Sequence, residues 1–159
     1  MKKKRRIFVP VLLGLVIVLL VAAIAVPVSA ATLSNNYKRD ALIAFSYAQY
    51  DDALYATAED VTCQIAAENV TALYQQVTAG APMPALFVKG DKTRAIRLDL
   101  GAENTLTILP TEDDGRVYTT LTYQGRTRSF VVTSNTSFLL ISRITSPAGL
   151  HAENFVYNP

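Results

Sequence analysis

Acidic side chains come nearest, in type and spacing, to the needs of catalytic chemistry. They cluster as Asp51-Asp52, Glu59-Asp60 and Glu112-Asp113-Asp114. Two carboxyl groups held at a suitable separation can hydrolyse a glycosidic bond, and a larger group can bind calcium. Each cluster falls in a predicted turn, where aspartate caps backbone amides, and the spacing of an EF-hand loop is absent. The clusters therefore favour a structural role, with a small hydrolase as the alternative.

The sequence contains few residues that could bind a metal or act as an activated nucleophile. The only cysteine is Cys63 and the only histidine is His151, too few ligands for a structural zinc site. Neither lies in a sequence typical of an activated nucleophile, and no phosphate-binding loop or nucleophile elbow is present. We therefore predict no catalytic residue, no metal ligand and no cofactor, and we expect Cys63 to be buried on a short strand.

Arginine and tyrosine side chains offer a candidate binding surface. Arginines can bind anionic envelope polymers or lipids, and tyrosines supply contact area at low entropic cost. The alternative is a structural role, in which the arginines protect strand edges from aggregation and the tyrosines pack in the core. The candidate partner surface consists of Arg94, Arg97, Arg126, Arg128, Tyr47 and Tyr50.

The N-terminus determines on which side of a membrane these residues act. Basic residues occupy positions 2–6, and positions 7–26 are apolar throughout. About twenty residues at a rise of 1.5 Å match the ~30 Å hydrocarbon core, and the cationic flank stays in the cytoplasm. The small residues before Ala31 also suit signal-peptidase cleavage after Ala30. We therefore predict residues 1–31 as a signal-anchor or signal peptide, placing the rest outside the cytoplasm, either on a single-pass anchor or secreted.

Charge excludes a nucleic-acid-binding class. The chain has 15 basic and 13 acidic residues, but the leader holds five of the basic ones. Ten basic residues then face thirteen acidic ones, so the exported part carries no basic excess for a phosphate backbone. The expected partners are the membrane, through the N-terminal helix, and a protein or envelope polymer.

The first elements after the leader are ambiguous. We predict a short polar spacer at residues 32–40, followed by one extracytoplasmic domain at residues 41–159. Alternation of apolar residues within 41–58 favours strands, although Ile43 and Tyr47 also fit helical spacing. The region 54–65 is expected to form one interrupted strand.

A helix is better supported farther along the chain. Apolar residues at positions 70, 73, 74 and 77 share one helical face, Glu68 lies in the first turn, and Gly80 provides a stop. Residues 134–145 favour a second, short helix, with a last strand as the alternative, and the tail is expected to dock on the core.

The second half predicts a β-meander. Residues 96–100 and 105–108 alternate apolar and polar side chains, and residues 116–123 and 126–132 are joined by Gln124-Gly125. This tight turn pairs Tyr123 with Arg126 and gives the hairpin one apolar face and one hydroxyl-rich, solvated face. The predicted fold class is α+β: a small antiparallel β-meander packed by one or two amphipathic helices, preceded by a transmembrane or signal helix.

These features lead to two main functional hypotheses, with an assembly or stability role in a membrane complex, carried by contacts of the anchor around Gly14, as a third possibility. The first is a non-enzymatic extracytoplasmic domain, anchored or secreted, that binds a protein or an envelope component through the exposed sheet face or a loop. The second is a small extracytoplasmic hydrolase that uses turn carboxylates. It would need a concave pocket in which at least two of Asp51, Asp52, Asp113, Asp114 and His151 converge.

Overall fold

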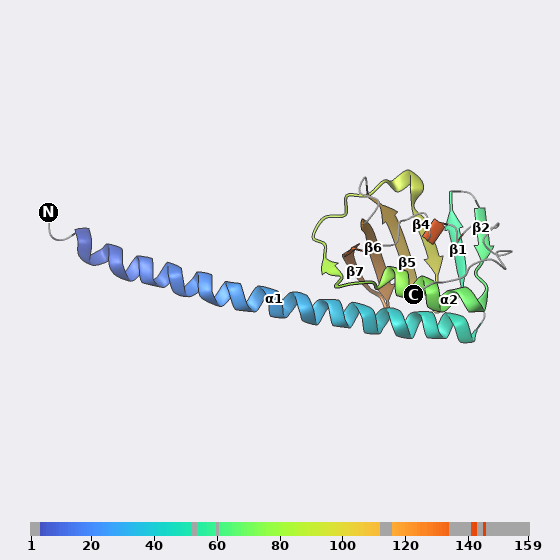
Figure 1. Cartoon of the computed structure of the whole chain (residues 1–159), viewed down its shortest axis with the longest axis horizontal. Helices are drawn as coiled ribbons and strands as arrows, with labels where there is room; N and C mark the ends of the chain where they lie inside the picture. Colours follow the sequence, from blue (N-terminus) through green and yellow to red (C-terminus); the bar gives the residue numbers. More distant parts are fainter. Residues whose placement is uncertain are drawn as a thin grey trace.

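The computed structural model describes residues 4–51, 54–59, 61–111, 116–133, 141–142 and 145, with side chains from residue 11 onward. Helices pack on one face of a seven-stranded antiparallel sheet, which confirms the α+β class (Figure 1). The predicted helix over 134–145, the C-terminal tail and His151 lie largely or wholly outside the described residues.

Helix α1, Lys4–Tyr50, is a single element of 47 residues. Its apolar N-terminal part projects from the domain, and large side chains from Val11 to Val28 are exposed (Figure 1). It is long and apolar enough to cross a membrane, a property that a signal sequence shares. A soluble domain rarely leaves so large an apolar patch uncovered, so this surface is typical of a membrane span or a signal sequence.

The C-terminal part of α1 corrects two predictions. Residues 32–40 are helical and carry the buried residue Tyr37, so they are not a loose spacer. The strand interpretation of residues 41–50 is also wrong. The short-range alternation there was a by-product of a helical stripe whose small side chains let α1 approach the sheet closely. The buried positions of this stripe are Ser34, Tyr37, Ala41, Ala44, Phe45 and Ala48.

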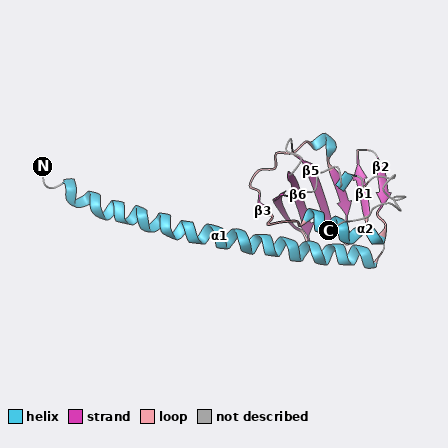
Figure 2. Ribbon diagram, in the orientation of Figure 1, coloured by secondary structure: helices cyan, strands magenta, loops and turns pink. Residues whose placement is uncertain are grey.

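The sheet, magenta in Figure 2, has the strand order β2-β1-β4-β5-β6-β7-β3. The four central meander strands are neighbours as predicted (Figure 1). Instead of one interrupted strand, residues 54–65 form a β1–β2 hairpin that turns at Glu59, where φ is +53°. The strands are β1 (Tyr55–Ala58), β2 (Val61–Gln64), β3 (Met83–Pro84), β4 (Ile96–Asp99), β5 (Thr105–Pro110), β6 (Arg116–Tyr123) and β7 (Arg126–Thr133).

The β6–β7 hairpin has the predicted register. Tyr123 pairs with Arg126, and Thr119 pairs with Phe130. Positive φ angles at Gln124 (49°) and Gly125 (72°) make the two-residue turn whose twist matches paired strands. The predicted division into faces is confirmed, since the apolar side chains are buried toward the helices.

Helix α2, Ala67–Val77, covers the same face of the sheet as α1. Its buried residues include Val70, Leu73 and Val77, which confirms the predicted apolar face. At its C-terminal end the Tyr37 hydroxyl donates to the Val77 carbonyl oxygen at 2.8 Å. The last carbonyl groups of a helix have no partner within it, so α1 completes the end of α2.

Candidate functional site

The sheet face opposite α1 and α2 is rich in hydroxyl groups; we call it the hydroxyl face. Side chains on a strand alternate between faces, so the residues paired across the sheet with Thr107 fall in one row on this side. That row, which we call the central row, crosses six strands. Its members are Thr62, Thr57, Arg97, Thr107, Thr120 and Ser129. A neighbouring row contains Gln64, Tyr55, Asp99, Thr105, Thr122 and Thr127.

The hydroxyl groups are held in fixed positions. Thr57 and Thr62 Oγ1 lie 2.9 Å apart, Thr120 Oγ1 lies 2.9 Å from Ser129 Oγ, and the Oγ1 atoms of a third cross-strand pair lie 3.0 Å apart. A hydroxyl has one donor and two acceptor positions, so each pair keeps capacity for an additional ligand or water. The face is therefore an array of oriented polar groups.

A groove borders the hydroxyl face where the loop between β3 and β4 crosses it. The groove has a volume of about 870 Å³. Its floor includes Tyr118 and Val131, which continue the hydroxyl face along β6 and β7, and the loop forms one wall. The lining residues are Met83, Lys89, Gly90, Asp91, Arg94, Thr111, Arg116, Tyr118 and Val131.

Backbone contacts pin both ends of this loop to the sheet. The Ala85 amide donates to the Ser129 carbonyl at 2.8 Å, and the Asp91 amide donates to the Pro110 carbonyl at 3.0 Å. Gly90 passes so close to the sheet that an added Cβ would lie 2.5 Å from Leu109 Cβ. Glycine is required here for close approach, and the loop wall of the groove is consequently fixed.

The wall is further ordered by Asp91, whose Oδ1 accepts hydrogen bonds from the Thr93 amide at 2.9 Å and the Thr93 hydroxyl at 2.6 Å. These bonds favour the charged carboxylate and lower its pKa. Their contribution is present above the ordinary pKa of aspartate and is lost as pH falls through the lowered value. The turn therefore stays ordered into mildly acidic conditions.

Charge in the groove is mixed. Lys89, Arg94 and Arg116 contribute three positive groups among the lining residues, against Asp91. The acidic segment 112–114, which joins two of the lining residues in sequence, lies outside the described residues. The described part of the groove thus provides cations beside an apolar and aromatic floor.

The structure distributes the predicted partner surface over several places. Arg94 lines the groove and Arg97 lies in the central row of the hydroxyl face. Tyr47 and Tyr50, 57% and 89% exposed, lie on the last turns of α1, away from both. The six residues therefore do not form one continuous patch.

Arg126 and Arg128 meet at a smaller cavity of about 210 Å³ beside α1. The Arg128 Nη1 atom lies 3.6 Å from Asp40 Oδ2, so this guanidinium faces the helix side of the sheet. The ion pair links β7 to α1, which is a structural function. Neither of these arginines adds to the hydroxyl face.

Cys63 lies in the core, as expected from the alternation in β2. Its thiol donates to the Thr145 carbonyl at 2.8 Å, and burial raises its pKa. The thiolate is the reactive form, so thiol–disulfide exchange with an added reagent should be slow in the native chain and should accelerate only at higher pH than for an exposed cysteine.

The rate at which Cys63 reacts can be measured with a colorimetric disulfide reagent on the full-length chain in detergent. We expect rapid labelling in guanidinium and labelling at least tenfold slower in the folded state. A Ser46→Cys variant in a Cys63→Ala background places a thiol on the exposed side of α1 and should react rapidly without denaturant. Equal rates for both thiols in the native chain would contradict the buried placement.

Catalytic chemistry gains no new support. Among the residues that the structure describes, no group of three or more His, Cys, Asp or Glu side chains is placed to hold a metal ion. Of the acids in the hydrolase hypothesis, Asp51 is exposed beyond the end of α1, while Asp52, Asp113 and Asp114 lie outside the described residues. That hypothesis stays a prediction.

Sequence reasoning missed the groove. The apolar residues 85–88 stand between a proline and a Lys-Gly-Asp turn, which is unusual for an exposed loop and was the available signal. The row across six strands could not be predicted from the sequence either, because its β1 and β2 members depend on the pairing of β1 with β4, which are not consecutive strands.

The chain matches no protein-family model, no curated protein and no solved structure.

Proposed function

We propose that the chain is a membrane-tethered, non-enzymatic binding domain on the extracytoplasmic side. Its ligand would be a polyhydroxylated envelope polymer that carries anionic groups, bound along the hydroxyl face with the groove at one end. The tether is the apolar part of α1, oriented by the basic residues at positions 2–6, which favour the cytoplasmic side.

The row of hydroxyl groups across six strands is the observation that carries this proposal. An extended polymer can lie along such a row and exchange hydrogen bonds with successive side chains without a deep pocket. Arg97 stands within the row, where a guanidinium can bind a carboxylate or phosphate group in bidentate geometry. Tyr118, at the groove floor, offers an aromatic surface for a sugar ring.

A protein partner is the other class of ligand for this face. It would require a larger apolar centre than the hydroxyl rows provide, since the buried centre of a protein interface is depleted in charge and enriched in aromatic residues. The polar character of the face therefore favours a polymer with many hydroxyl groups.

Co-sedimentation of the full-length chain in nanodiscs with insoluble envelope polysaccharide tests the proposal. Thr107→Glu places a negative charge in the central row and should weaken binding at least tenfold, a change of about 1.4 kcal/mol. Arg97→Glu should have a similar effect and should also weaken the salt dependence of binding.

Thr71→Glu is the matched control, because Thr71 is exposed on α2 at the opposite face of the domain. It should bind like the native chain. Thermal melting must show that all variants fold. If the two variants of the hydroxyl face sediment with the polymer as well as the control does, this face is not the binding surface.

A further inference from the structure

We infer that the loop between β3 and β4 inserts its exposed apolar residues into the surface of the bilayer that α1 spans, fixing the domain upright on the membrane. This inference rests on the membrane anchor of the proposed function and adds a second, separate membrane contact. It concerns Leu86, Phe87 and Val88, with Lys89 at their C-terminal side.

The first observation is exposure. Leu86 is 92% exposed and Phe87 is 76% exposed, although the loop is pinned to the sheet at both ends. Single exposed apolar residues are common, but a contiguous exposed patch marks a site of interaction with a partner or a membrane. Here the pinned backbone prevents them from folding back, so they are presented outward by a fixed scaffold.

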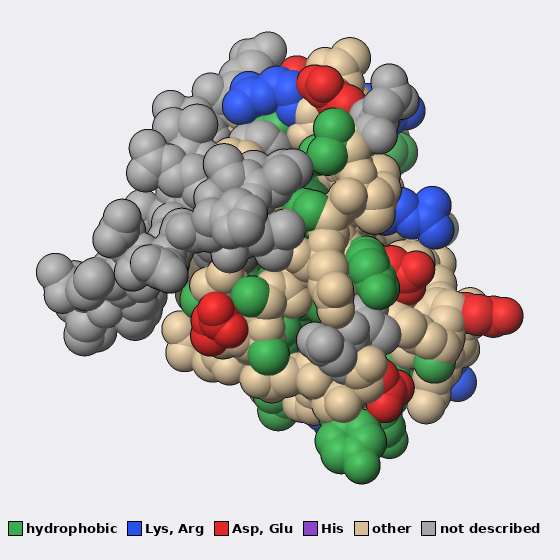
Figure 3. All heavy atoms as spheres, turned by 90° about the vertical axis from the view of Figure 1, so that its right-hand side faces the viewer, with side chains coloured by type: hydrophobic (Ala, Val, Ile, Leu, Met, Phe, Trp, Pro, Cys, Tyr) green, Lys and Arg blue, Asp and Glu red, His purple; other side chains and the backbone are tan. Residues whose placement is uncertain are grey.

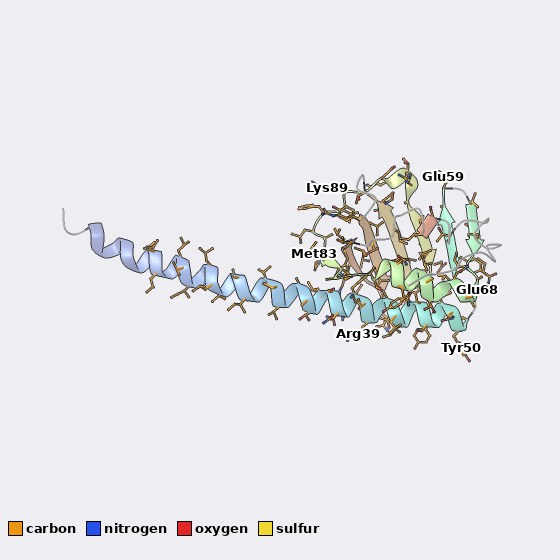
Figure 4. All side chains as sticks on the ribbon, in the orientation of Figure 1. Arg39, Tyr50, Glu59, Glu68, Met83 and Lys89 are labelled. Atoms are coloured by element: carbon orange, nitrogen blue, oxygen red, sulfur yellow. The ribbon has the colours of Figure 1, made fainter. Side chains whose placement is uncertain are left out.

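The second observation is direction. Met83 and Lys89, which bracket these residues in the chain, lie at the end of the domain from which the apolar part of α1 projects (Figure 4). The opposite end of the domain carries both acidic and basic side chains scattered over its surface (Figure 3). The apolar loop therefore faces the same way as the membrane-spanning segment.

The third observation is the short distance between the apolar segment of α1 and the start of the domain. Val28 is an exposed apolar residue of α1 and Ser34 is the first buried one. Six residues of helix rise about 9 Å, whereas one headgroup layer is roughly 5–8 Å thick. Because α1 is continuous between these points, the domain begins at the outer edge of the headgroups, with no spacer to separate it from the bilayer.

Charge complementarity agrees with this placement. Lys89 follows the apolar residues directly, and a lysine at that depth can extend its ammonium group to lipid phosphates while its stem stays in the apolar region. The Lys38 ammonium on α1 donates a hydrogen bond to the Gly80 carbonyl, which links the segment before β3 to the anchor helix. The lipid headgroup region is thus the occupant that fits both the apolar and the basic side chains.

Site-specific fluorescence can test the contact, because the chain has no tryptophan. Phe87→Trp is reconstituted as the full-length chain in vesicles of phosphatidylcholine and phosphatidylglycerol containing brominated lipid. We expect its emission to shift to shorter wavelength and to be quenched. Tyr50→Trp, at the far end of α1, should emit as a water-exposed indole and escape quenching.

Val18→Trp, in the middle of the apolar segment, reports on the anchor itself. If its indole is quenched while that of Phe87→Trp remains in water, the loop contact is wrong and the anchor stands. If Val18→Trp is not quenched, the anchor is wrong and the loop contact falls with it. Quenching of Tyr50→Trp together with Phe87→Trp would mean a domain lying on its side, which also overturns the upright orientation.

Discussion

Replacing Tyr37 by alanine should strongly destabilise the domain, because it removes the largest side chain that α1 buries against the sheet. Tyr37 is 1% exposed, and its ring lies 4.4 Å from that of Phe130 between centroids. Losing a buried aromatic side chain costs about 3–5 kcal/mol. In a chain of this size the melting temperature should fall by about 10 °C or more, measured by circular dichroism in detergent.

Tyr37→Phe separates the hydroxyl from the ring. The hydroxyl lies within hydrogen-bond distance of two buried groups, the Val77 carbonyl at 2.8 Å and Thr119 Oγ1 at 3.0 Å. Removing it leaves these groups without that partner, so we expect a loss of about 1–3 kcal/mol. Tyr50→Ala is the control: this residue is 89% exposed on the same helix, and its removal should change stability by less than about 0.5 kcal/mol. Equal melting temperatures for the two tyrosine-to-alanine variants would contradict the packing of α1 on the sheet.

Gly90→Ala should displace the loop wall of the groove. The new Cβ would meet Leu109 Cβ at 2.5 Å and the Pro110 carbonyl at 3.1 Å, and neither belongs to a flexible side-chain end. Overpacking of this kind costs about 1–3 kcal/mol, and the simplest relief is movement of the loop away from the sheet. The hydrogen bond from the Asp91 amide to Pro110 should then break.

Hydrogen exchange gives a direct measurement of that bond. The Asp91 amide should be protected in the native chain and should exchange at least tenfold faster in Gly90→Ala. Lys92→Ala, in the same loop but with an exposed side chain, should leave the protection unchanged. Unchanged protection in Gly90→Ala would show that the loop tolerates a side chain at this position.

The hairpin of β6 and β7 was predictable because its information is local. A two-residue Gln124-Gly125 turn fixes the register, and strict alternation then determines which side chains share a face. The same holds for α2, whose apolar spacing of three and four residues has no competing interpretation.

The C-terminal part of α1 was not predictable by the same means. Half of its buried stripe is alanine, which is neither strongly apolar nor distinctive in pattern, so the apolar–polar alternation around Phe45 determined the strand prediction. Helix formation in this segment depends on continuity with the apolar segment and on docking against the sheet, which are non-local effects. The groove was missed for a related reason, since the loop crosses strands that are distant in sequence.

The position of Ser34 also bears on what cleavage after Ala30 would do to the domain. Among the described residues, no buried position precedes Ser34, and signal-peptidase cleavage after Ala30 would fall four residues earlier. A cut there would remove most of the exposed apolar part of α1 and keep every described buried position in the product. Cleaved and uncleaved chains would therefore share the same described core, and only the attachment of the domain to the apolar segment would differ.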